Sequence, residues 1–189
     1  MYVPNGKKHV PAFLGLNFRG NYTTTSDPAV LKPDSLQVER FGRYEDLERG
    51  SWSTRWPYEM AVRRGYAVVT VFHSDIDPDW DDRQVNGVHS LYPELKGDDS
   101  WGTLAAWAWG LSRALDYLEK DKDIDAHKVA VIGHSRHGKA ALWAGATDPR
   151  FALVISNNSG CGGAALSKRA IASASASAKS LPMPGTWAP

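Results

Sequence analysis

The sequence has little that would tie the chain to a membrane, to nucleic acid or to a disulfide scaffold. It contains a single cysteine among 189 residues, which excludes a disulfide within the chain and leaves open a reducing compartment or export. No apolar run approaches the ~20 residues of a membrane span. The formal net charge is only +1, so the composition predicts no nucleic-acid partner and no anionic membrane surface.

The first residues also lack the basic start and apolar core of a signal peptide, so they predict no export signal. What is present is ordinary for a globular domain, with 42% hydrophobic and 23% charged residues. The eight tryptophans are the exception. Flat rings often stack on sugars, but packing in the core and at interfaces is the interpretation we favour for each one.

Apolar runs alternate with helical patterns along the chain. Continuous apolar runs are typical of strands buried on both faces of a parallel sheet. We expect Pro57 in the first turn of the first helix, Gly65 as its stop, and Ser100 or Asp99 as the cap of the second. The second helix carries one apolar stripe: Leu104, Trp107, Ala108, Leu111, Leu115 and Leu118. The sequence therefore predicts an α/β fold, a mostly parallel sheet flanked by helices, with strands at 11–18, 66–72, 128–132 and 151–156 and helices at 57–64, 101–120 and 138–147.

Two loops and the cysteine allow alternative interpretations. Residues 22–55 are a long polar excursion, and such loops are usually functional. The aspartates of 75–82 suggest Ca²⁺, but the glycine and closing glutamate of an EF-hand loop are missing, so we favour loop chemistry. Cys161 has no neighbouring base, so we expect a small buried cysteine, not a thiol nucleophile.

The segment from Val131 to Lys139 carries the chemistry. Gly133-His134-Ser135-Arg136-His137-Gly138-Lys139 follows a predicted buried strand and opens a predicted helix. Glycines at 133 and 138 permit a tight turn that raises the Ser135 hydroxyl to the top of the sheet, as in the nucleophile elbow of α/β-hydrolases. The next backbone N–H and the helix N-terminus favour a developing oxyanion. The pattern departs from G-x-S-x-G at His137, and the alternative is a helix-capping serine in another doubly wound fold.

The same segment resembles the G-x-S-R-x-G-K signature of the glucuronoyl esterases, carbohydrate esterase family fifteen. The resemblance is strongest to bacterial members and covers roughly residues 2 to 171. Four further segments resemble that family: Phe13-Leu14-Gly15-Leu16-Asn17-Phe18, Asp75-Ile76-Asp77-Pro78, Asn86-Gly87-Val88-His89 and Ser159-Gly160-Cys161-Gly162-Gly163-Ala164.

The resemblance implies hydrolysis of esters between glucuronate on glucuronoxylan and lignin alcohols, without cofactor or metal. It implies Ser135 as nucleophile, Arg136 as oxyanion stabiliser and Lys139 as a ligand of the glucuronate hydroxyls. A guanidinium beside the nucleophile supplies charge-assisted donors, and loss of one oxyanion donor costs about 3 kcal/mol. The alternatives are a surface ion pair for Arg136 and a solvated helix residue for Lys139.

The acid and the base of a catalytic triad are not evident. In many fungal members a glutamate stands where this chain has Asn158, and some bacterial members take the acid from a later loop. Hydrolases of this fold place the histidine after the acid, yet only His137 follows Ser135. His73 and His89 lie upstream, off the usual order, and His134 reads as a packing or hydrogen-bonding residue.

We therefore expect a partial α/β-hydrolase domain over 1–171 whose C-terminal part is missing, and a low-complexity, disordered tail over 172–189. Losing triad members costs on the order of 10⁶ in kcat, so weak or no turnover is expected. An acetyl-xylan or other ester hydrolase and an inactive, carbohydrate-binding fragment remain alternatives. The family resemblance implies a secreted or periplasmic protein.

Overall fold

A computed structural model describes residues 1–32, 47–95, 97 and 99–165 of the chain. The tail expected at 172–189, the last residues of the domain expected over 1–171, and part of the long polar loop lie outside the described residues. Among the helices that the structure describes, none has the length and apolar character needed to cross a bilayer.

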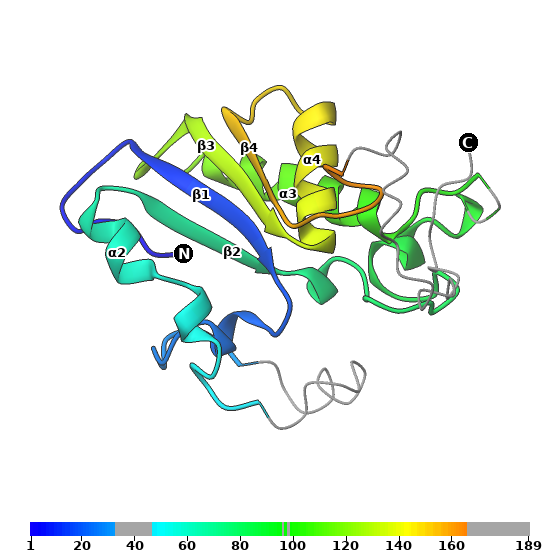
Figure 1. The fold of residues 1–189 in the computed structure, drawn as a ribbon, viewed down its shortest axis with the longest axis horizontal. Coiled ribbons are helices and arrows are strands. Elements are labelled where there is room, and N and C mark those ends of the chain that lie inside the picture. Colours follow the sequence, from blue (N-terminus) through cyan, green and yellow to red (C-terminus); the bar gives the residue numbers. More distant parts are fainter. Residues whose placement is uncertain (33–46, 96, 98, 166–189) are drawn as a thin grey trace, which may run out of the picture.

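In the part of the chain that the structure describes, four parallel strands form the central sheet (Figure 1). Their order is β2-β1-β3-β4. β2 therefore lies on one side of β1, and β3 and β4 lie on the other side. The carboxyl ends of the strands share one edge, because Asn17 pairs with Phe72 and Gly133 with Ser156. The strands are β1 (Val10–Asn17), β2 (Ala67–Phe72), β3 (Ile124–His134) and β4 (Leu153–Asn157).

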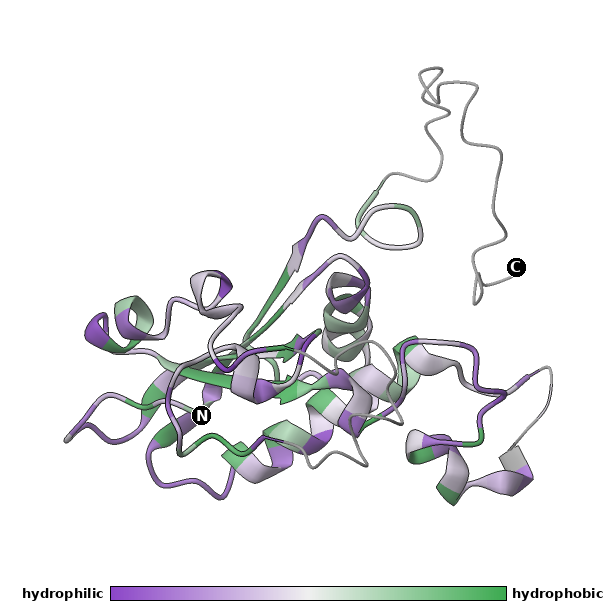
Figure 2. Ribbon diagram, turned by 90° about the horizontal axis from the view of Figure 1, so that it is seen from below, coloured by the Kyte–Doolittle hydropathy of each residue, from purple (hydrophilic) through white to green (hydrophobic). Residues whose placement is uncertain are grey.

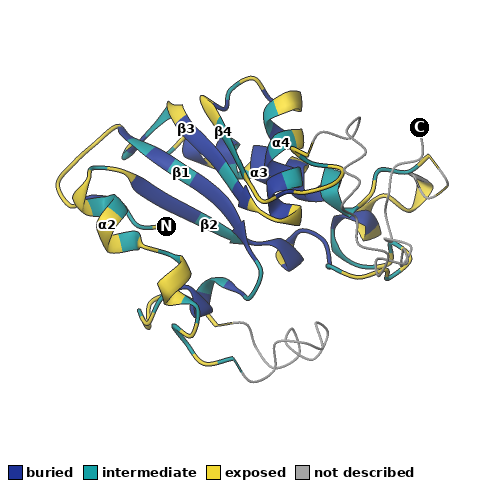
Figure 3. Cartoon of the chain, viewed as in Figure 1, coloured by how far each residue is buried: buried dark blue, intermediate teal, exposed yellow. Residues whose placement is uncertain are grey.

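Two long helices, α3 (Thr103–Leu118) and α4 (Arg136–Thr147), pack against each other and against β3. The apolar stripe predicted for the second helix is confirmed, since five of its six residues are buried in α3 and Leu104 packs at the margin of the core. The close approach of α4 to β4 requires Gly145, where a Cβ would lie 2.1 Å from Val154 Cγ2. Figure 3 shows the resulting core as the inner strands and the facing sides of the helices.

The short helix α2 (Tyr58–Arg63) packs along β2. Gly65 ends it as predicted: its φ is 89°, and the N–H groups of Gly65 and Tyr66 bond back to Val62 and Ala61. Pro57 lies one residue earlier than predicted, at the N-cap. In Figure 2 apolar colour follows the strands. The exposed residues of α2 include the apolar Met60 as well as Glu59 and Arg63.

The predicted cap of α3 is wrong. Gly102 is the N-cap residue, and it makes no side-chain cap hydrogen bond. Ser100 lies two residues too early, and its hydroxyl accepts a hydrogen bond from Gln84 Nε2 at 2.7 Å. Ser100 thus fixes the preceding loop, not the helix.

Several element boundaries differ from the prediction, and two of these differences concern the starts of β3 and α4. β3 begins at Ile124, four residues before the predicted start, because its first residue pairs with Val10 of β1. α4 begins at Arg136, two residues before the predicted start. The helix therefore starts directly after Ser135, which bears on the candidate site.

Candidate active site

Ser135 occupies the sharp turn between β3 and α4. Its backbone has φ 57° and ψ −127°, a conformation that costs a side-chain-bearing residue about 1–3 kcal/mol. Its N–H donates to the Asn157 carbonyl at 2.9 Å, and its own carbonyl accepts from Gly138 N–H at 2.9 Å. The residue is exposed. The predicted geometry, an exposed serine between an extended strand and a helix start, is confirmed.

The two glycines of the turn are required by close contacts. A Cβ on Gly133 would lie 2.0 Å from the His137 carbonyl oxygen. A Cβ on Gly138 would lie 3.0 Å from Ser159 Cβ. Strand and helix therefore approach too closely for any side chain at position 133, as the sequence pattern predicts.

Arg136 is the first residue of α4, so its backbone N–H has no acceptor within the helix. Its guanidinium forms an ion pair with Asp79, in which Nε lies 2.9 Å from Oδ2, and Cζ lies 5.5 Å from the centroid of the Phe18 ring. The side chain is 54% exposed and that of Asp79 is 17% exposed. Arg136 does form an ion pair, the alternative that the sequence left open, but it does so beside the candidate nucleophile.

Lys139 lies one turn further along α4 and is half-buried. Its ammonium approaches the loop after β4, since a Cβ on Gly162 would lie 3.7 Å from Nζ. The sequence-predicted residues Ser135, Arg136 and Lys139 thus lie on one short segment at the carboxyl edge of the sheet. This edge, where the strand order reverses, is where open α/β sheets bind ligands.

Beneath this segment lies a buried pair of histidines. His73 Nδ1 and His137 Nε2 are 2.8 Å apart, and both side chains are essentially inaccessible. Phe18 stacks on the His137 ring at 3.7 Å, and Trp107 stacks on the His73 ring at 4.8 Å. Burial lowers the pKa of His73 well below its ordinary 6.5, and the charge of Arg136 lowers it further. Burial likewise lowers the pKa of His137, with His73 and Arg136 contributing, so the pair is neutral at physiological pH.

The other buried histidine, His89, closes the loop that follows β2. Its Nδ1 is 2.7 Å from Asp77 Oδ1, and its Nε2 donates to the Trp101 carbonyl at 2.7 Å. Burial raises the pKa of the Asp77 carboxyl, an effect that hydrogen bonds from Thr103 and His89 oppose. Both ring nitrogens of His89 are engaged, so the dyad holds the loop and is not a free base.

The remaining sequence predictions concern His134, at the end of β3, and the loop after β4. His134, at the end of β3, has Nδ1 3.3 Å from Asn157 Nδ2, in line with its expected hydrogen-bonding role. Cys161 is exposed, so the prediction of a buried cysteine is wrong. It lies in a turn beyond the sheet, where the packing that buries small side chains is absent. Asn158 has a positive φ of 49° in the same turn, which suits asparagine.

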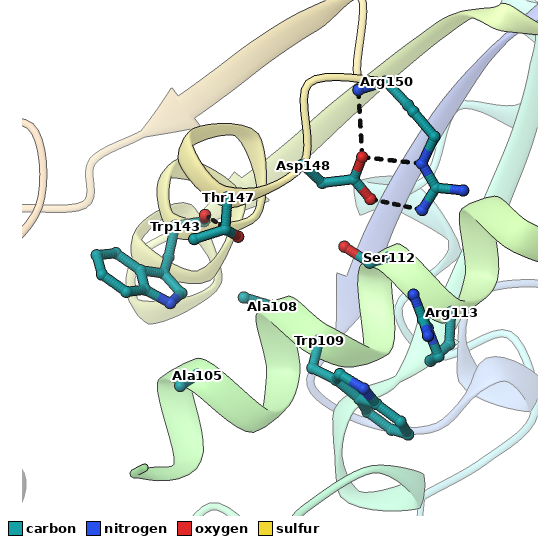
Figure 4. A pocket seen from close by; sticks show the side chains of 9 residues that line it. All are labelled: Ala105, Ala108, Trp109, Ser112, Arg113, Trp143, Thr147, Asp148 and Arg150. Carbon is teal, nitrogen blue, oxygen red and sulfur yellow. Dashed lines mark hydrogen bonds and ion pairs between the residues drawn. The ribbon is translucent and has the colours of Figure 1, made fainter.

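A hollow of about 390 Å³ lies elsewhere, between α3 and α4 (Figure 4). Trp109 and Trp143 line it and are partly exposed, while Trp107 is fully buried. Two of its charged groups bond to each other: Asp148 accepts from Arg150 Nε and Nη2 at 2.9 and 2.6 Å. None of its lining residues belongs to the Ser135–Lys139 segment, so we place the candidate site at the strand edge.

Comparison with known proteins gives the family. The model of the family described as "Glucuronyl esterase, fungi" matches residues 54–182. The chain belongs to the glucuronyl esterase family. It is 50% identical over 180 residues to the carbohydrate esterase MZ0003 from an unknown prokaryotic organism, which covers 89% of this chain and 41% of that protein. It is 39% identical over 117 residues to 4-O-methyl-glucuronoyl methylesterase 1 of Wolfiporia cocos, covering 57% of this chain and 28% of that protein.

The fold agrees with solved glucuronoyl esterases. A glucuronoyl esterase from Solibacter usitatus superposes with a TM-score of 0.76 at 43% identity, over 88% of this chain and 44% of that chain. The predicted α/β-hydrolase-type fold is confirmed, as is the resemblance to carbohydrate esterase family fifteen. The chain spans less than half the length of these glucuronyl esterase relatives.

Sequence reasoning missed the partners of Arg136, namely Phe18 and Asp79, and the pairing of His73 with His137. Phe18 and His73 directly follow the carboxyl ends of β1 and β2, and Asp79 lies in the loop that follows β2. Because these ends meet at one edge of a parallel sheet, that position is the signal that would have found them.

Proposed function

We propose that this chain carries the nucleophile part of a serine carboxylic-ester hydrolase that acts on esters of glucuronate. The observation that carries the proposal is Ser135, an exposed hydroxyl held in a strained turn between a strand end and a helix start. A packing or capping serine has no need of such strain. Strained backbone persists only where the surrounding structure over-determines it, and it clusters at active sites.

The chemistry follows from what surrounds the hydroxyl. Attack by Ser135 Oγ on an ester carbonyl places negative charge on the carbonyl oxygen. The free N–H of Arg136, the positive end of α4 and the guanidinium all favour that charge, and they lie ready before the reaction. Lys139, one turn along, supplies donors for ring hydroxyls of a sugar acid. Arg136 and Lys139 together favour an ester of a sugar acid, whose carbonyl oxygen and ring hydroxyls can accept hydrogen bonds from them, over an acetyl ester.

The substrate is proposed from the relatives. Several are named 4-O-methyl-glucuronoyl methylesterase, which supports a methyl ester of glucuronate as a bond that is cleaved. We propose glucuronoxylan, joined through its glucuronate to lignin alcohols, as the polymer, and a secreted or periplasmic location, where such polymers are found. The site needs no cofactor or metal for this chemistry.

One specific observation favours a second candidate, a non-catalytic carbohydrate-binding chain. Within the described ranges, no histidine hydrogen-bonds the Ser135 hydroxyl, since His73 bonds to His137 and His89 bonds to Asp77 and Trp101. A serine without a base is a poor nucleophile. We therefore expect low turnover from this chain.

The two candidates are separated by a fluorophosphonate probe, with a Ser135→Ala variant as the control. The esterase proposal predicts a covalent adduct on Ser135 that the variant lacks. Absence of the adduct supports the non-catalytic candidate. Hydrolysis of methyl glucuronate compared with an acetylated xyloside then separates a glucuronate esterase from an acetyl esterase, and faster acetate release would overturn the substrate assignment.

A further inference from the structure

The Arg136 guanidinium is held from two sides by residues of other elements. Asp79, from the loop after β2, forms an ion pair with it, in which Oδ2 lies 2.9 Å from Nε. Phe18, directly after β1, lies under the guanidinium with its ring centroid 5.5 Å from Cζ. An exposed arginine at the start of a helix ordinarily samples many rotamers, so both contacts restrict where its charge can be.

The support beneath the guanidinium is itself rigid. Phe18 stacks on His137 at 3.7 Å with only 13° between the ring planes. His137 is buried and bonded to His73, which stacks on the buried Trp107. A series of packed rings therefore extends from the core to the guanidinium of Arg136. These rings prevent the guanidinium from moving inward toward the core.

The ion pair with Asp79 uses only one of the nitrogens of the Arg136 guanidinium. A guanidinium has five N–H donors, one on Nε and four on the two terminal nitrogens. The ion pair with Asp79 is made through Nε. The terminal NH₂ groups thus remain for a ligand that arrives at Ser135.

We propose that Asp79 is a positioning residue, which orients Arg136 so that its terminal NH₂ groups face the oxygen of a substrate carbonyl attacked by Ser135. The inference rests on the proposed esterase function. An isolated surface ion pair contributes little because both partners are solvated and mobile. This pair differs, since the Asp79 side chain is only 17% exposed and Arg136 rests on a fixed ring. Preorganised donors of this kind contribute more to catalysis than donors that must reorient.

The orientation is tested without any turnover by following the Arg136 Nε–H in ¹H–¹⁵N spectra of the full 189-residue chain. The signal is assigned from its loss in Arg136→Lys. In Asp79→Asn, which retains shape and removes the charge, we expect its hydrogen exchange to accelerate by at least about tenfold, because a charged partner no longer holds the guanidinium in place. Asp79→Glu keeps the acceptor and should retain most of the protection.

Glu59→Gln is the matched control. Glu59 forms an exposed ion pair with Arg63 within α2, and neither residue belongs to the candidate site. It should leave the Arg136 signal unchanged. Exchange of Arg136 Nε–H that is equally fast in the parent chain and in Asp79→Asn would overturn the inference.

The consequence for chemistry is read from the rate of Ser135 modification by the fluorophosphonate probe, whose phosphoryl oxygen also gains negative charge. Asp79→Asn should slow this rate about tenfold, a fraction of the loss expected when an oxyanion donor is removed outright. An unchanged rate, with Arg136 demonstrably loosened, would also overturn the inference. If even the parent chain is not modified, the proposed function fails, and the exchange measurement alone decides whether Asp79 positions Arg136.

Discussion

At the scale of single residues, the site depends on the backbone of Ser135. Its φ of 57° is strained, and backbone hydrogen bonds to the neighbouring elements compensate for that strain. The Asn157 carbonyl accepts the Ser135 N–H, and Gly138 and Lys139 bond to the Ser135 carbonyl. Hydrogen bonds to β4 on one side and to the first turn of α4 on the other therefore hold Ser135 in its strained conformation.

This strain predicts an order of stability between two variants that both lack the hydroxyl. Ser135→Gly should be more stable than Ser135→Ala by about 1 kcal/mol, because glycine adopts positive φ without a steric penalty. Urea denaturation followed by circular dichroism measures the difference. Equal midpoints, or a more stable alanine variant, would show that the turn is relaxed in solution.

How far the sequence predicts single residues depends on whether their partners are local. Gly133, Ser135 and Gly138 are recognisable because the turn that requires them is formed within seven residues. The contacts of Asp79 and Phe18 with Arg136 are not recognisable in the same way. They depend on β1 lying between β2 and β3, a strand order that no local pattern specifies.

At the scale of elements, Arg150 joins the ends of α3 and α4. Its Nη1 donates to Asp116 of α3 and to Glu119 just beyond that helix, at 2.8 and 2.9 Å. Its Nε and Nη2 donate to both oxygens of Asp148, the C-cap residue of α4 (Figure 4). Hydrogen bonds from Arg150 lower the pKa of Asp148 to about 2, so the carboxylate is charged at all ordinary pH values.

Asp148→Asn should lower the free energy of unfolding by roughly 1–3 kcal/mol at pH 7, the range for a hydrogen-bonded charged group. Glu59→Gln, which breaks an exposed ion pair, should change it by less than about 1 kcal/mol. The folded-state pKa lies below the ordinary 3.8, so this stabilisation is complete above about pH 4 and is lost as pH falls toward 2. A destabilisation that persists unchanged at pH 2 would contradict this account. Urea titrations at both pH values provide the measurement.

The elements themselves are mostly predictable, and their ends are less so. The stripe of α3 and the stop at Gly65 follow from helical spacing and from positive φ, which are local properties. The start of β3 at Ile124 and the cap at Gly102 are not local. The first depends on pairing with Val10, and the second on a loop in which Ser100 bonds to Gln84 instead.

At the scale of the whole molecule, the histidine pair lies where the segments after β1 and β2 meet α3 and the elbow. His73 and His137 are buried neutral, and both have a lowered pKa. The unfolded chain takes up a proton on each histidine below about pH 6.5, and the folded chain does not. Stability should therefore fall as pH decreases from 6.5 toward the lowered pKa values.

For two such groups, the slope of the free energy of unfolding against pH approaches about 2.7 kcal/mol per pH unit. Replacing His73 by phenylalanine should remove about half of this pH dependence. The exposed His127 provides the control, since His127→Gln leaves the buried pair intact. Free energies of unfolding between pH 7 and 4.5 check the prediction. Asp75 and Asp77, whose pKa values burial raises, oppose the slope equally in every variant, so the difference between variants is the quantity to compare. Parallel curves for the parent and His73→Phe would contradict it.

The central claim is that Ser135 is a nucleophile held ready at the strand edge, and covalent labelling tests it most directly. The full chain and Ser135→Ala are treated with a fluorophosphonate and digested, and the adduct is located by mass spectrometry. The account predicts one adduct, on the peptide that contains Ser135, and none on the variant. An unlabelled parent chain, or an adduct that survives in the variant, would contradict it.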